Sequence, residues 1–101
     1  MQTDADIQVW LNNTAQAQTQ VIVPYVSSSS AQDLRYRIRA VQEKDGNRAV
    51  IGQTGVIHIA ADTPAAISRL SLNRHPGERC EIEIMLTGRN FETLRYVFEC
   101  P

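Results

Sequence analysis

Residues 80–100 read CEIEIMLTGRNFETLRYVFEC, and this stretch carries the clearest signal of the fold. Apolar residues recur at every second position on either side of a Gly-Arg-Asn segment, which is the pattern of two β-strands joined by a turn. With the turn at residues 88–90, the strands form a hairpin in which Leu86 lies opposite Leu94. The same register sets positions 84 and 96, and then 82 and 98, opposite each other on the face that we expect to be buried.

The two cysteines of the chain, Cys80 and Cys100, end this hairpin on its apolar face. The register places them opposite each other, where a disulfide would contribute on the order of 3 kcal/mol for a loop of about 20 residues. Two buried thiols acting as small apolar side chains fit the same positions, and a disulfide between opposed strands is geometrically demanding. The sequence therefore leaves both states open. Without a C-x-x-C pair, neither a zinc site nor a thioredoxin-like motif is indicated.

The rest of the chain shows similar short alternating or apolar runs, separated by residues that favour turns. Candidate strands lie at residues 5–11, 19–27, 33–42, 47–52, 55–61, 66–73, 79–87 and 91–99. Seven or eight short antiparallel strands at a spacing of about ten residues indicate an all-β, immunoglobulin-like β-sandwich. Because proline cannot donate a backbone hydrogen bond, we expect the strand that contains Pro24 to lie at a sheet edge or to carry a bulge.

Composition limits the size of the fold and the classes of partner. A chain of 101 residues that is 43% hydrophobic fits a single immunoglobulin-like domain, residues 1–101, with one core. Ten basic and eleven acidic side chains give a formal net charge of -1, which argues against a nucleic acid partner. No apolar run approaches the roughly 20 residues of a membrane helix, so we expect no membrane insertion. The N-terminus also lacks the pattern of a secretory signal, which leaves the compartment open.

The segment LRYRIRAV places arginine at every second position. In a strand, Arg35, Arg37 and Arg39 share one face, and we call these three residues the arginine stripe. The third strand of an immunoglobulin-like sandwich commonly pairs with the penultimate one, whose outward face here carries Glu81 and Glu83. The stripe therefore predicts either a cross-strand charge ladder, at roughly 0.2 to 1 kcal/mol per pair, or a surface that binds a partner.

No residue pattern in the sequence indicates catalysis. His58 and His75 are the only histidines, and neither has a His, Cys or Asp at ligand spacing, so we expect surface or turn positions for both. A nucleophile elbow, a P-loop and a dinucleotide-binding glycine motif are all missing from the sequence. We therefore predict that the protein is not an enzyme and that it uses no cofactor and no metal.

The segment IAADTPAAISRLSLNRHPGERCEIEIMLT resembles the curli assembly inhibitor family, the CsgC/CsgH-like proteins. The likeness lies in a loop of the form A-x-x-P/T-x-A, in the block ISRLSLN, and in the turn PGER before an alternating apolar strand. It covers residues 55–87 well and the rest of the chain by strand order. Some members carry a Cys-x-Cys pair early in the third strand, where this chain has Leu34 and Tyr36, so the resemblance favours the CsgH branch that lacks the pair.

The resemblance implies a small immunoglobulin-like protein of the periplasm that holds curli amyloid subunits in a non-amyloid state, as a chaperone-like inhibitor. A disordered, polar client that stacks into cross-β needs weak contact with a surface that does not itself become a template, and a charged, twisted sheet face has this property. We therefore hypothesise that the arginine stripe, with Glu81 and Glu83, contacts the major subunit transiently, and we expect a monomer. The competing interpretation is a structural or adhesive β-sandwich module of a surface or pilus-type assembly, with a stable partner and an unpaired edge strand.

Overall fold

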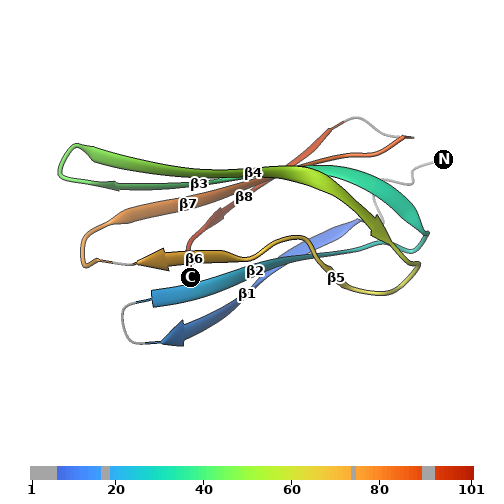
Figure 1. Ribbon diagram of the computed structural model, residues 1–101, viewed down its shortest axis with the longest axis horizontal. Helices are drawn as coiled ribbons and strands as arrows, with labels where there is room; N and C mark the ends of the chain where they lie inside the picture. The colour runs from blue at the N-terminus through green and yellow to red at the C-terminus, as the bar shows by residue number, and fades with distance from the viewer. Residues whose placement is uncertain (1–6, 17–18, 74, 90–92) are drawn as a thin grey trace.

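The computed structural model describes residues 7–16, 19–73, 75–89 and 93–101. Within these ranges the chain forms eight β-strands in two antiparallel sheets that pack together as a sandwich (Figure 1). The strands are β1 (Gln8–Gln16), β2 (Thr19–Ser27), β3 (Gln32–Lys44), β4 (Asn47–Ile59), β5 (Ala65–Ala66), β6 (Leu70–Asn73), β7 (Arg79–Thr87) and β8 (Leu94–Glu99). The expected all-β, immunoglobulin-like sandwich is confirmed. A helix with the length and hydropathy to span a membrane is not found in these ranges.

The charged strands belong to the sheet with the order β4-β3-β7-β8. β3 pairs with β7, as expected for the third and penultimate strands of such a sandwich, and Arg39 lies opposite Glu83. In the last hairpin Leu86 lies opposite Leu94, and the pairing continues through positions 84 with 96 and 82 with 98. The register predicted for residues 80–100 is therefore confirmed.

A disulfide closes the far end of this hairpin. It joins Cys80 and Cys100, whose Cα atoms are 5.3 Å apart. The backbone N–H of Cys100 donates to the carbonyl oxygen of Cys80 at 3.1 Å, so the pairing of the two strands reaches the cysteines. Of the two states that the sequence left open, the structure has the disulfide, which fastens the C-terminal strand to β7.

The other sheet has β2 at its centre, with β1 on one side and β5 and β6 on the other. The expectation that the strand of Pro24 lies at an edge or carries a bulge is wrong, because β1 pairs with β2 residue for residue, with Leu11 opposite Pro24. The Pro24 carbonyl oxygen accepts a hydrogen bond from the N–H of Ile67 at 2.8 Å, between β5 and β6. Because the N–H and C=O of a strand residue point to the same side, the missing donor of Pro24 faces the break between these two short strands.

Several predicted bounds differ from the observed ones. The runs at 47–52 and 55–61 form one strand, β4, which pairs with β3 from Asn47 to Ile59 without interruption. The Asn-Asn-Thr segment that predicts a turn after residue 11 lies inside β1, and the run at 66–73 is divided between β5 and β6. Pairing with a neighbouring strand outweighs the turn propensity of Asn and Gly in these places. Positions 5, 6 and 90–92, which the predictions place in strands or a turn, lie outside the described residues.

The core lies between the two sheets and takes alternate residues from both. Ile22 of β2, Ile38 of β3 and Ile84 of β7 are fully buried in one cluster. Burying an aliphatic side chain of this size contributes about 1.5 to 3 kcal/mol. The buried cluster contains Ile7, Ile22, Val26, Leu34, Ile38, Ala40, Ile59, Ile67, Leu70, Leu72, Ile82, Ile84 and Leu86. Because each strand alternates, the residues between these positions form the two outer faces.

Candidate functional site

The outer face of the β4-β3-β7-β8 sheet carries the charged residues that the sequence singled out. On β3, Leu34 and Ile38 are buried, whereas Arg35 and Arg37 are exposed and Arg39 is half-buried. The arginine stripe therefore forms one outward row along β3, as the alternation predicts.

The strands on either side leave most of this row without an acidic neighbour. On β7 the stripe meets two uncharged residues and one acid, with Thr87 opposite Arg35, Met85 opposite Arg37 and Glu83 opposite Arg39. On β4 the residues opposite the stripe are all uncharged, namely Val56, Thr54 and Gly52. Across these strands, only one pair of directly opposite residues has opposite charges, namely Arg39 and Glu83. The charge-ladder interpretation therefore accounts for one arginine of the stripe at most.

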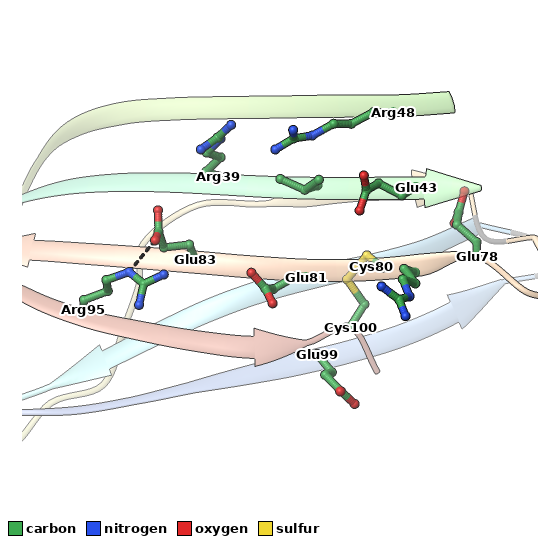
Figure 2. A pocket seen from close by; sticks show the side chains of 12 residues that line it. Arg39, Glu43, Arg48, Glu78, Cys80, Glu81, Glu83, Arg95, Glu99 and Cys100 are labelled. Atoms are coloured by element: carbon green, nitrogen blue, oxygen red, sulfur yellow. Dashed lines mark hydrogen bonds and ion pairs between the residues drawn. A yellow bond between two sulfur atoms is a disulfide. The ribbon is translucent and has the colours of Figure 1, made fainter. Parts of the chain in front are cut away.

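Glu83, the acidic residue of that pair, is bonded to a different arginine. Nε of Arg95 on β8 donates to the carboxylate of Glu83 at 2.5 Å (Figure 2). The Arg95 side chain is 60% exposed, so this ion pair adds at most about 1 kcal/mol to stability. Within the described residues, no ion pair and no side-chain hydrogen bond involves the arginine stripe. Its guanidinium groups are therefore available to an external partner.

The part of this face that carries the acidic residues lies beside the stripe, toward the disulfide, and it also carries basic side chains. A groove of about 650 Å³ runs along this end of the sheet. Figure 2 shows Glu81, Glu83 and Glu99 on the β7 and β8 side of the groove, with Arg39 and Arg48 on the β3 and β4 side. Glu81 is exposed and Glu83 half-buried. All five residues that the sequence assigns to a partner-binding patch therefore lie on one face. The stripe forms its basic row, and on β7 and β8 the acidic residues alternate with Arg79 and Arg95.

A glycine on β4 leaves part of the stripe open to close approach. Gly52 lies opposite Arg39, and a notch of about 280 Å³ beside the stripe is lined by Val50, Gly52 and Thr54. Arginine presents several N–H donors in a rigid fork that fits carboxylates and carbonyl oxygens. A strand position without a side chain also allows another backbone to come near. The stripe and the notch together offer N–H donors and open space of the kind that an extended polypeptide would need.

The histidines lie on the surface, as expected. The His58 ring on β4 contacts the carboxylate of Asp33 on β3, and both side chains are more than half exposed. Ligand spacing along the sequence does not reveal Asp33, because strand pairing joins residues that are 25 positions apart. His75 is exposed in the turn before β7. Among the described residues, no three His, Cys, Asp or Glu side chains are close enough together to hold a metal ion.

Comparison with known sequences relates the chain to curli assembly. The family model described as thin aggregative fimbriae synthesis protein, Tafi-CsgC, matches residues 3–94. The curli assembly protein CsgC of Escherichia coli strain K12 is 26% identical over 80 residues, which cover 79% of this chain and 73% of that protein. The same values hold for CsgC of Escherichia coli O45:K1 strain S88.

Two solved structures have the same fold. The E. coli curli protein CsgC, in the form designated SeCys, gives a TM-score of 0.80 at 24% identity, covering 91% of this chain and 97% of that chain. The solution structure of R. palustris CsgH gives a TM-score of 0.74 at 10% identity, covering 92% and 91%. The expected closeness to the CsgH branch is therefore not supported, because the CsgC structure has the higher identity and the higher TM-score. Since the family model spans most of the sequence, this chain belongs to the Tafi-CsgC family of thin aggregative fimbriae synthesis proteins.

Proposed function

We propose that this chain is a periplasmic, chaperone-like inhibitor of curli amyloid formation. Support comes from its family and from relatives that are named curli assembly proteins. On this proposal the chain binds amyloid subunits, the major subunit above all, and delays their fibrillation. It does so through the arginine stripe together with Glu81 and Glu83.

The observation that carries the proposal is the outward arginine stripe, for which the described residues supply no ion-pair partner. Arg35 and Arg37 are bordered on both sides by uncharged residues, and the described residues contain no ion pair to any arginine of the stripe. Such guanidinium groups donate to the carboxylates and carbonyl oxygens of an extended client without first breaking a bond within the protein. Glu81, which is exposed one strand away, would meet basic side chains of the same client, and Glu83 would do so beside its bond to Arg95.

The exposure of these charges also explains why binding would be transient. Contacts between solvent-exposed charges are worth about 0.2 to 1 kcal/mol each and are screened by salt. A few such contacts hold a disordered chain briefly, which is enough to act before a cross-β nucleus forms. One molecule of this protein can therefore act on many client molecules in turn.

The test is a fibrillation time course of a purified curli major subunit, followed by thioflavin-type fluorescence. With this protein at a small fraction of the subunit concentration, we expect a lag phase lengthened several-fold. The triple variant Arg35→Glu, Arg37→Glu and Arg39→Glu reverses the stripe, and we expect it to lose most of the effect. If that variant keeps its β-sheet circular dichroism spectrum and still delays fibrillation as the wild type does, the stripe is not the client surface.

A matched control separates the stripe from net charge. Lys44, Arg69 and Arg89 are exposed and lie outside the stripe. Changing these three residues to Glu alters the net charge by the same amount as the stripe variant. We expect this control to delay fibrillation nearly as well as the wild type. An equal loss of activity in both triple variants would assign the effect to overall charge and would remove the stripe from the proposal.

One observation favours the alternative, a structural or adhesive module. Within the described residues β4 pairs only with β3, so the other side of β4 is an unpaired sheet edge. A donated strand from an assembly partner could pair with such an edge. This function predicts a stoichiometric complex that survives size-exclusion chromatography, whereas the inhibitor function predicts an effect on the lag phase and no stable complex.

A further inference from the structure

Within the described residues, the middle of the free edge of β4 has none of the features by which proteins protect sheet edges. β4 is 13 residues long, forms the upper border of the ribbon in the left part of Figure 1, and pairs with β3 in an unbroken register. Residues 49–57 of this strand contain no charged side chain, no proline and no bulge. Proteins usually blunt long edges with such features, because unpaired N–H and C=O groups pair readily with another strand. An edge this long and regular is therefore able to pair with a strand of another molecule.

The β3–β4 turn determines which backbone groups point away from the molecule. Lys44 and Asn47 pair across the two-residue turn formed by Asp45 and Gly46, whose φ angles of 52° and 81° are those of a type I′ turn. The pair that closes such a turn exchanges hydrogen bonds, and bonded positions then alternate along the strand. Odd-numbered residues of β4 therefore bond to β3, and even-numbered residues direct their N–H and C=O outward.

The exposed apolar side chains of β4 occupy two of these even positions. Val50 is 49% exposed and Val56 is 69% exposed, and both lie on the outer face. They are equally far from Gln53 along the strand. If a second β4 pairs antiparallel about Gln53, each Val50 lies directly opposite Val56 of the other copy. The pairing also joins even positions to even positions, which is the only way the outward N–H and C=O groups can bond.

We propose that the β4 edge is a self-association surface, on which two copies of this chain pair antiparallel about Gln53. The contact is isologous, because the same strand serves both copies. It covers both exposed valines of each copy in cross-strand pairs. On the inner side of the sheet, Ile51 of one copy lies opposite Gly55 of the other. Ile51 and Ile57 are half-buried in a single copy, because they pack against the core at its open edge. Shifting the centre of the pairing by one residue separates the valines, so the register follows from their spacing.

This arrangement departs from the expected monomer for a physical reason. The sequence pattern divided β4 into two short runs, and neither run by itself indicates an edge 13 residues long. Pairing at the edge keeps the outer faces of both copies on the same side of one continuous sheet, because the two-fold axis is perpendicular to that sheet. Both arginine stripes then face the same way. The proposal is about self-association and stands or falls independently of the proposed client.

The test is the mass of the protein in solution as a function of concentration. Sedimentation velocity from the micromolar to the millimolar range should show the mass rise from 11.3 kDa toward twice that value. Val56→Lys places a charge opposite Val50 twice in each dimer, so we expect its dissociation constant to rise about tenfold or more. Val97, exposed on β8 of the same face, is the matched control, and Val97→Lys should leave dimerisation unchanged.

Two charge variants test the register itself. Val50→Glu and Val56→Lys should each weaken self-association, and mixing the two single variants should restore it, because the introduced carboxylate of one copy then meets the introduced ammonium group of the other across the interface. A wild type that stays at 11.3 kDa up to millimolar concentration overturns the proposal. A dimer that Val97→Lys weakens as much as Val56→Lys, or that the mixture fails to restore, overturns the β4 register.

Discussion

Glu83 bonds to Arg95 on β8, although Arg39 on β3 lies directly opposite Glu83 in the strand register. One carboxylate oxygen of Glu83 is thereby held by Arg95, and the guanidinium group of Arg39 has no ion pair within the described residues. Arg95 therefore helps to keep the arginine stripe unpaired. The Arg95–Glu83 ion pair contributes little to stability, but it affects which charges on this face are paired.

This relationship predicts the effect of replacing Arg95. In Arg95→Ala, the Glu83 carboxylate is free to pair with Arg39, so part of the stripe is neutralised. We expect the free energy of unfolding to change by no more than about 1 kcal/mol, while the concentration needed to double the fibrillation lag rises a few-fold. Arg95→Lys keeps the charge and should retain most of the activity. Equal activity of Arg95→Ala and the wild type would show that Arg39 does not depend on this pair.

Inhibition should weaken as salt is added. Exposed charges are screened over about 10 Å at 0.1 M ionic strength and over about 3 Å at 1 M. We expect the lengthening of the lag phase to shrink several-fold as sodium chloride rises from low to high concentration, measured against the subunit alone at each salt concentration. The variant with the stripe reversed should show little of this dependence. Inhibition that does not change with salt would point to apolar contacts instead.

A second pair of residues predicts a stability effect on β4. A Cβ atom at Gly55 would lie 2.6 Å from the hydroxyl oxygen of Tyr36 and 2.8 Å from its ring. The ring therefore lies over the glycine, and Gly55→Ala forces Tyr36 to move, at a cost of about 1 to 3 kcal/mol. At Gly52 the nearest atom to such a Cβ is the Ile38 carbonyl oxygen, at an ordinary 3.9 Å. Urea denaturation should show a clear loss for Gly55→Ala and little or none for Gly52→Ala, and equal losses would contradict this view of Tyr36.

The disulfide should matter for stability. Removing it in Cys80→Ala with Cys100→Ala should lower the free energy of unfolding by about 3 kcal/mol, because the loop that it closes has a sequence separation of 20. Dithiothreitol should lower the urea midpoint of the wild type and leave that of the double variant unchanged. A reductant effect of the same size in both proteins would show that it acts on something other than this bond.

Alternation in the sequence was sufficient to predict several parts of the fold. The period of two over residues 34–40 identified which side chains of β3 are buried and which carry charge outward, because a strand leaves no other choice of face. In residues 80–100 the short turn linked two alternating strands closely enough to predict their register, and with it the position of Cys100 beside Cys80. These features depend on neighbours in the chain, which a sequence displays directly.

The sequence by itself thus determined the all-β class, the register of the last hairpin, and the outward arginine row of β3. Only the tertiary structure decided which charges are paired, because the neighbours of Arg39 come from β4 and β7, strands that its own local pattern does not identify. It also decided that Pro24 lies at the centre of its sheet, opposite a break in the adjoining strand, and that β4 is one long edge strand paired on one side among the described residues. Such features depend on which strands become neighbours in space, and local patterns of side chains do not specify that choice.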